Sequence, residues 1–303
     1  MKHLIIAAAL AAVTAASAAE LTVKPYKPWN TVAPGEYSLD YDGSQSWPTV
    51  KLDVKDMKPE TYYRLSVECR TAGKVAPQLC CHDSRDGKKI SRYVTLKGGK
   101  EEFAPLAIYF KTGDLKNFDL FINLNPGTAG KVELRNIKLE EVADFSGNLL
   151  AGGDFEKGCG GFEPNFTADD GVRIVSDAGF LSGEKSLKIV KPADKGAGVS
   201  SNPLPVLPGK TAVVKFWAKS GNGTLNAYVI FDCFQGEQNR HLYKEIIFKL
   251  EPEWKEYSFE FAVPADVNEY TGLKEGTCRL RLGLRSSSET AEGFFDNVEY
   301  SIK

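Results

Sequence analysis

Residues 118–140 read FDLFINLNPGTAGKVELRNIKLE, and apolar and polar side chains alternate at both ends of this stretch. The turn sequence NPGTAG separates the two alternating segments. Strict alternation is typical of a β-strand with one buried face, and a cluster of Asn, Pro and Gly is typical of the turn between two strands. The stretch therefore predicts two β-strands joined by a turn.

The two halves of the chain resemble each other when they are shifted by roughly 150 positions. CRLRLGLRSSSETAEGFFDNVEYS at 278–301 repeats the pattern of 118–140, and VLPGKTAVVKFWAKSG at 206–221 repeats MKPETYYRLSVECRTAG at 57–73. The period is that of a whole domain, which is too long for a solenoid repeat. We therefore predict two tandem domains that are joined near residues 142–147.

The rest of the chain also alternates with a period of two, as at residues 213–219, 225–233 and 257–263. Gly- and Pro-rich turns separate these segments, and no amphipathic helix of three turns or more is found. Phe and Tyr, which favour strands, are numerous, with 17 and 12 copies. These features predict an all-β fold class with two tandem β-sandwich, or jelly-roll, domains after a signal peptide.

The N-terminus has the pattern of a secretory signal peptide. Lys2 and His3 precede an apolar run, residues 4–13, and small residues follow at 14–19. The apolar run is too short for a membrane anchor, and no Cys lies at the cleavage point. We predict a signal peptide at 1–19, domains at 20–144 and 145–303, and a secreted, periplasmic or cell-surface location.

Charge and cysteine content exclude several function classes. The net charge is −2 and the charges are mixed along the chain, so neither nucleic acid binding nor a polybasic membrane patch is indicated. The six cysteines lack the paired short spacing of a zinc site. We expect buried thiols with about one disulfide in each domain, and the pairing stays open.

Several motifs occur in a fixed order after residue 147: NLLAGGDFEKG, VRIVSDAGFLSGEKSLKIV, LPGKTAVVKFWAKSG, WKEYSFEFAVP and FFDNVEYSI. Together they resemble carbohydrate-binding modules of the family four, nine and twenty-two type across residues 148–303. Residues 20–143 resemble these modules only weakly, because they lack the NLLxGGDFE start and have Arg135-Asn136 where the second half has Asp296-Asn297. The resemblance implies a jelly roll that binds glycans without cleaving them.

The same resemblance implies a structural calcium ion in the second domain. Its ligands would be Glu156 of GDFE, Asp296 of FFDNV and backbone carbonyls near 182–185, with Asp154 as a further carboxylate. Calcium takes six to eight oxygen ligands, which suits carboxylates and carbonyls. The alternative is that these carboxylates only cap turns or face solvent.

Alternation separates the side chains of the second domain into a core set and an outer set. The predicted core set is Val214, Phe216, Ala218, Ala227, Val229, Phe231, Leu280, Leu282 and Leu284. Aromatic planes pack against sugar rings, and Arg and Asp bind hydroxyl groups, so the outer set predicts a glycan site. Arginines would also favour acidic or sulfated glycans. The predicted glycan-binding residues are Lys215, Trp217, Tyr228, Asp232, Arg279 and Arg281.

The first domain offers a weaker case for glycan binding. Phe121 is the only aromatic residue in its expected outer set, so a degenerate domain or a spacer is the favoured interpretation. Trp29 and Trp47 lie in turn-rich segments and could either cap the sandwich or form a loop site.

We therefore expect a non-catalytic carbohydrate-binding protein whose partner is a polysaccharide or glycan. One alternative is an adhesion or assembly protein that binds another surface protein, because fold does not fix function. A second is a polysaccharide lyase, for which Gln238, Arg240, His241 and Tyr243 would supply acid–base groups from a polar loop. No nucleophile elbow, phosphate loop or zinc-binding helix occurs in the sequence.

Overall fold

The computed structural model describes residues 19–85, 88–95, 102–124, 128–158, 161–164, 172–175, 179–235, 240–267 and 278–303. Within these ranges the regular secondary structure is made of β-strands without a helix. None of the described segments is therefore a helix that could cross a membrane. The predicted signal peptide lies outside the described residues, apart from Ala19.

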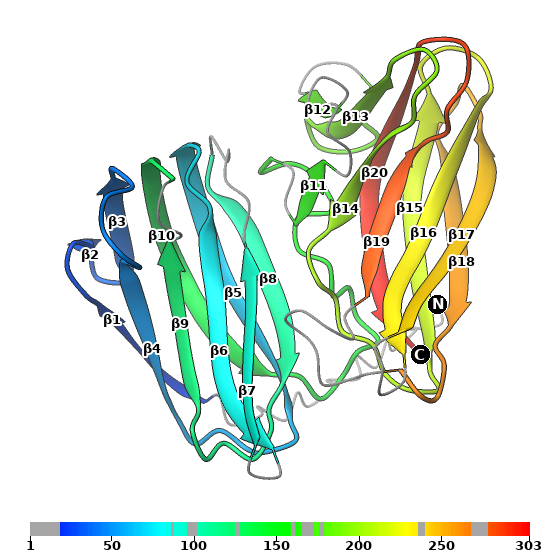
Figure 1. Ribbon diagram of the computed structural model, residues 1–303. Coiled ribbons are helices and arrows are strands. Elements are labelled where there is room, and N and C mark those ends of the chain that lie inside the picture. Colours follow the sequence, from blue (N-terminus) through cyan, green and yellow to red (C-terminus); the bar gives the residue numbers. More distant parts are fainter. Residues whose placement is uncertain are drawn as a thin grey trace, which may run out of the picture.

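The first domain consists of two five-stranded sheets (Figure 1). Sheet A contains, in spatial order, β1 (Glu20–Pro25), β4 (Thr49–Lys55), β9 (Asp119–Leu124), β6 (Pro77–Arg85) and β7 (Lys88–Thr95). Sheet B contains β2 (Asn30–Ala33), β3 (Glu36–Tyr41), β10 (Gly130–Glu141), β5 (Tyr62–Gly73) and β8 (Ala104–Lys111).

The second domain also has two five-stranded sheets. Sheet C contains β11 (Phe162–Pro164), β14 (Ala197–Ser201), β19 (Arg279–Leu284), β16 (Leu225–Gln235) and β17 (Arg240–Leu250). Sheet D contains β12 (Val172–Val175), β13 (Ser186–Lys191), β20 (Ala291–Ile302), β15 (Thr211–Ser220) and β18 (Lys255–Ala262).

The two domains have the same topology. Adding ten to each strand number of sheets A and B gives the strand order of sheets C and D. The stretches that repeat in the sequence fall on equivalent strands: 57–73 and 206–221 form β5 and β15, and 118–140 and 278–301 form the pairs β9–β10 and β19–β20. The predicted all-β fold of two tandem sandwiches is confirmed.

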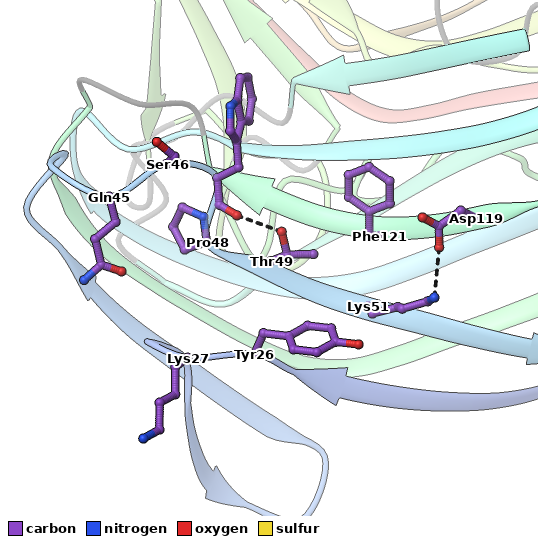
Figure 2. A pocket seen from close by; sticks show the side chains of 10 residues that line it. Tyr26, Lys27, Gln45, Ser46, Pro48, Thr49, Lys51, Asp119 and Phe121 are labelled. Carbon is purple, nitrogen blue, oxygen red and sulfur yellow. Dashed lines mark hydrogen bonds and ion pairs between the residues drawn. The ribbon is translucent and has the colours of Figure 1, made fainter.

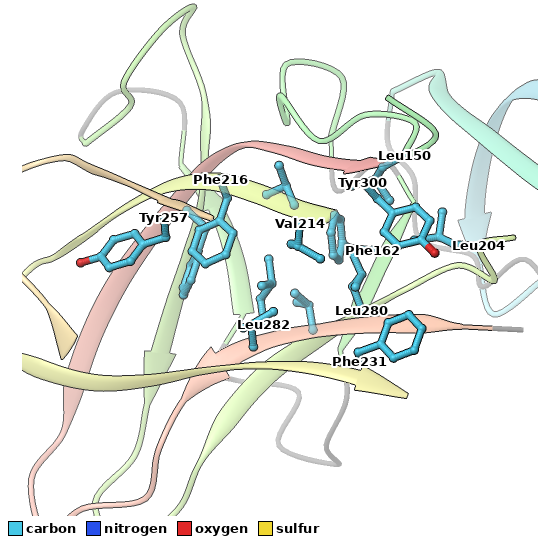
Figure 3. Packing of buried hydrophobic residues seen from close by; sticks show 14 of the residues in the cluster. Leu150, Phe162, Leu204, Val214, Phe216, Phe231, Tyr257, Leu280, Leu282 and Tyr300 are labelled. Atoms are coloured by element: carbon cyan, nitrogen blue, oxygen red, sulfur yellow. The ribbon is translucent and has the colours of Figure 1, made fainter. Parts of the chain in front are cut away.

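The core of the second domain lies between sheets C and D (Figure 3). Phe216 is fully buried among Phe248, Tyr257, Phe259 and Phe295, with ring centroids 5.7 to 6.0 Å apart. All nine residues that alternation assigns to the interior belong to this core. Alternation therefore predicted correctly which side of each strand faces the core, although the outer side of β16 is also buried, at Tyr228, Ile230 and Asp232.

A contact between the domains fixes the start of the second domain to sheet B. The Tyr62 hydroxyl donates to the Val206 carbonyl at 3.0 Å, and the Tyr109 hydroxyl donates to the Leu149 carbonyl at 2.8 Å. Tyr109 is 2% exposed and packs with the core of the second domain. Two ion pairs add to this contact, Lys157–Glu68 at 3.7 Å and Lys185–Glu102 at 3.3 Å.

The five cysteines that the structure describes are buried. They are Cys69, Cys80, Cys81, Cys233 and Cys278, and Cys159 lies outside the described residues. The expected buried thiols are thus present, whereas no disulfide joins any two of these five.

Candidate functional site

The six predicted glycan-binding residues do not share one face. Lys215 and Trp217 lie on β15 of sheet D, whereas the other four lie on β16 and β19 of sheet C. The two sheets meet through their inner faces, so their outer faces point to opposite sides of the sandwich. The single predicted face is therefore corrected: β15 and β16 are consecutive in the chain but enter different sheets.

The outer face of sheet C, which we call the β16 face, carries Tyr228, Ile230 and Asp232 of β16. Cross-strand partners in an antiparallel sheet project to the same side. Register therefore adds residues of β19 and β17 to this face, because Asp232 is paired with both Arg279 and Tyr243. The remaining pairs place these residues on the β16 face: Arg281, Gly283, His241, Glu245 and Ile247.

Asp232 is the centre of a charged cluster on the β16 face. Its side chain is only 8% exposed, and its two carboxylate oxygens contact the Arg281 guanidinium and the His241 imidazole. A buried carboxylate needs such partners, because its desolvation is costly. Arg279, the cross-strand partner of Asp232, is exposed.

Tyr228 lies flat across the neighbouring strands of the β16 face. A Cβ atom on Gly198 of β14 or on Gly283 of β19 would collide with its hydroxyl group, so these glycines make room for the ring. The side chain is 5% exposed, and burial raises its pKa to about 12. Among the described residues, neither its hydroxyl nor the buried Nε of Arg281 has a hydrogen-bond partner. Both atoms are closed to solvent, so a ligand would reach them only when these side chains move.

Strand β17 contributes residues that the sequence analysis did not assign to a glycan site. Tyr243 is 46% exposed and Ile247 is 53% exposed, and the Tyr243 ring lies 6.0 Å from the His241 ring. The sequence indicates a polar loop that opens into a strand here, and Arg240, His241 and Tyr243 all lie in the strand itself, β17. The signal for this strand was the spacing of its inner side chains at every second position, Ile246, Phe248 and Leu250. Gln238 lies outside the described residues.

Trp217 has a different environment on the outer face of sheet D. It is half-buried and is paired in register with the fully buried Asp296 of β20. Lys215 is exposed on the same side. These two residues share no surface with the Asp232 cluster, so a single ligand on the β16 face would not reach them.

The residues predicted to hold calcium bind a turn of the chain. Glu156 accepts the backbone N–H groups of Glu184 and Lys185 at 3.0 Å, and a Cβ atom on Gly183 would collide with its carboxylate. Asp296 accepts the N–H groups at positions 181, 182 and 297, at 3.0, 3.3 and 2.7 Å. The turn at 181–185 thus presents amide donors to both carboxylates.

Asp154 is exposed, whereas Asp296 is fully buried. Burial raises the pKa of Asp296, the negative charge of Glu156 raises it further, and the N–H donors oppose both effects. In the described part of the chain, no group of three or more His, Cys, Asp and Glu side chains is placed to hold a metal ion. Two converging carboxylates suit a divalent cation, but they do not complete a coordination shell, so the calcium site stays a prediction.

The first domain has an ion pair at the equivalent place. Asn136 of β10 and Asn297 of β20 both have positive φ, 53° and 48°, at a register shift of their strands. Arg135 precedes the first Asn where Asp296 precedes the second, and its Nε lies 2.7 Å from the Glu68 carboxylate. An arginine cannot bind a metal ion, so the first domain has the same strand geometry without the carboxylate pair.

Comparison with known proteins supports the resemblance of the second half. Residues 147–271 match a family model described as a carbohydrate binding domain. No curated protein matches the chain.

Solved structures with similar strand arrangements include a family 16 carbohydrate-binding module, 21% identical, which covers 50% of this chain and 99% of its own, with a TM-score of 0.39. The tandem CBM22-1–CBM22-2 domain of Paenibacillus barcinonensis Xyn10C is 16% identical and covers 95% of this chain and 99% of its own, with a TM-score of 0.41. At these values the solved structures do not bear on the function of this chain.

Proposed function

We propose, from the match of residues 147–271 to the carbohydrate binding domain family, that this protein binds a polysaccharide or glycan on the β16 face. The observation that carries the proposal is the pair of buried polar atoms on this face, the Tyr228 hydroxyl and the Arg281 Nε, which have no partner among the described residues. Leaving such groups unpaired costs about 1–3 kcal/mol each, a cost that a hydroxyl-rich ligand would remove.

The chemistry of the β16 face suits a sugar ring. The exposed Tyr243 offers aromatic surface to the C–H groups of a pyranose. Arg281, Asp232 and His241 supply donors and acceptors close to this ring. The face thus combines apolar contact with directional hydrogen bonds, as ligand sites require.

The charge balance of the face favours a neutral glycan over an acidic one. Arg281 is paired with Asp232, and Arg285 is paired with Glu245 at 2.8 Å. Paired guanidinium groups have less to offer a ligand carboxylate, because binding it would displace an existing partner. Among the residues considered for acidic glycans, Arg279 would then be the main remaining cation.

The binding test uses the full chain in native affinity gels that contain neutral or uronate polysaccharides. The wild type should be retarded by at least one neutral polymer, and Tyr243→Ala should weaken this retardation by about tenfold, as for a central aromatic contact. Phe180→Ala is the matched control, since Phe180 is an aromatic residue 40% exposed elsewhere in the second domain.

The same experiment separates the alternative functions. Absence of retardation on every polysaccharide would overturn the proposal and favour the protein-binding adhesion class. Release of unsaturated products from uronate polymers would instead identify a lyase, and a non-catalytic module should release none.

Two further parts of the proposal concern export and calcium. The basic, apolar and small-residue pattern at 1–19 supports export, which N-terminal sequencing of the mature protein would test. Glu156 and Asp296 would supply two carboxylates to a structural calcium ion, and their mutual repulsion supports a cation between them.

A further inference from the structure

The outer face of sheet A has a hollow of about 400 Å³ in the first domain. Sheet A is the topological equivalent of sheet C, so this hollow lies on the counterpart of the β16 face. Figure 2 shows Tyr26, Thr49, Lys51, Asp119 and Phe121 around it. Its volume falls within the range of about 300–1,000 Å³ that is usual for small-molecule sites.

Trp47 is displayed at the hollow by a rigid loop. Its side chain is 50% exposed, and its backbone has φ of 52°, which is unfavourable for a bulky residue. The Tyr41 hydroxyl donates to the Gln45 carbonyl at 2.6 Å, and the Thr49 hydroxyl donates to the Trp47 carbonyl at 2.8 Å. An exposed indole in a strained and supported backbone indicates a functional position.

Tyr26 supplies a second exposed aromatic ring beside this loop. Its side chain is 52% exposed, and its backbone N–H donates to the Thr49 carbonyl at 3.1 Å. The segments that carry Tyr26 and Trp47 are therefore bonded to the same residue. Phe121 of β9 completes three aromatic side chains from three separate segments.

The charged groups that line the hollow are Lys27, Lys51 and Asp119, and Lys51 is paired with carboxylates. The Lys51 ammonium lies 3.4 Å from Asp119 and 3.7 Å from Asp53. The Asp119 Oδ1 is buried without a hydrogen-bond partner in the described residues, apart from this ion pair. The Asp119 side chain is 40% exposed, so its other oxygen can accept from a ligand hydroxyl, whereas the Lys51 charge is already compensated.

We infer that this hollow is a second glycan site, which binds a neutral pyranose unit between Trp47, Tyr26 and Phe121. The inference takes its ligand class from the proposed function but uses a different domain. Aromatic rings around a balanced ion pair favour a neutral ring with hydroxyl groups over an anion. A glycan site here would replace the expected degenerate or spacer role of the first domain. That expectation rested on the strands, whereas Tyr26 and Trp47 lie outside them.

The test titrates the full chain with cellohexaose, xylohexaose, mannohexaose and galactohexaose by isothermal titration calorimetry. For at least one hexaose, Trp47→Ala and Tyr26→Ala should each raise Kd about tenfold or more. Phe180→Ala, which lies outside both faces, should leave that affinity unchanged. Because both side chains at the hollow are half-exposed, the melting temperatures should stay close to that of the wild type.

Each outcome decides between the two sites. Affinity that is lost only in Tyr243→Ala would overturn the second site and leave the proposed function intact. Affinity that is lost only in the hollow variants would support the second site, and the polysaccharide gels with Tyr243→Ala would then decide the β16 face. If the wild type binds none of the four hexaoses, the inference is wrong, and the polysaccharide gels then decide the proposed function alone.

Discussion

Two tyrosines of the second domain differ in what their hydroxyl groups contact. The Tyr257 hydroxyl donates to the Lys249 carbonyl at 2.8 Å, whereas the buried Tyr228 hydroxyl has no partner among the described residues. Tyr228→Phe should therefore raise the free energy of unfolding by about 1 kcal/mol, because it removes an unsatisfied group. The same change should weaken glycan binding, because it removes the hydroxyl that we propose binds the ligand. Urea unfolding and affinity gels measure the two effects.

Tyr257→Phe is the control for this prediction. It removes a hydrogen bond that is already made, so it should lower the free energy of unfolding by about 1 kcal/mol and leave binding unchanged. If Tyr228→Phe destabilises the protein as much as Tyr257→Phe does, the Tyr228 hydroxyl has a structural partner, and the case for the β16 face weakens.

The buried cysteines give a second prediction for single residues. Burial raises the pKa of Cys80 and of Cys233 to about 12, and it raises the pKa of Cys278 as well. At pH 8 only about one such thiol in ten thousand is a thiolate, which is the reactive form. In a Cys159→Ser background, a disulfide reagent should label no thiol of the native protein and all five after unfolding. Fewer than five labelled thiols after unfolding would reveal a disulfide among these cysteines.

At the scale of strands, the sequence predicts burial better than it predicts neighbours. Alternation assigned Val214 and Phe216 of β15 to the core correctly, and it assigned Tyr228 and Asp232 of β16 to an outer face. It could not show that these strands belong to different sheets, because sheet order depends on long-range pairing. Trp217 was therefore grouped with residues on the far side of the sandwich. Of the aromatic hollow, the sequence indicated only Trp47 as a possible loop site, because loops have no alternating pattern that would group it with Tyr26 and Phe121.

The turn at 181–185 and strand β20 give a prediction about pH. Burial holds the pKa of Asp296 above its ordinary value of 3.8. The folded state therefore binds this proton more tightly than the unfolded state, so the stability from Asp296 is present below the ordinary pKa and is lost as pH rises through the raised one. In chelator, Asp296→Asn should gain stability relative to the wild type between pH 3.8 and neutral. Urea unfolding at several pH values measures this difference.

Added calcium tests the proposed metal site in the same pair of proteins. A bound ion should stabilise the wild type by about 2.7 kcal/mol at a free concentration of one hundred times Kd, and Asp296→Asn should respond less. If calcium does not change the melting temperature of the wild type, the proposed metal site is wrong. The pH dependence measured in chelator would still apply, because it requires only the amide donors of the turn as partners of the carboxylates.

For the whole molecule, the contact between the domains should couple two glycan sites. The Tyr62 and Tyr109 hydrogen bonds hold the second domain against sheet B, so the β16 face and the hollow keep one relative orientation. Two linked sites bind a polymer more tightly than either site alone, provided that the polymer spans both. The wild type should bind a neutral polysaccharide at least about tenfold more tightly than the matching hexaose.

This gain should disappear in either single-site variant, Trp47→Ala or Tyr243→Ala, because avidity needs both sites at once. Tyr62→Phe with Tyr109→Phe, which loosens the contact between the domains, should keep both hexaose affinities and lose part of the gain on polymer. Affinity electrophoresis on polymer and calorimetry on hexaoses separate these quantities. Equal affinity of the wild type for polymer and hexaose would mean that one chain segment cannot reach both sites, and the domains would then act on separate glycans.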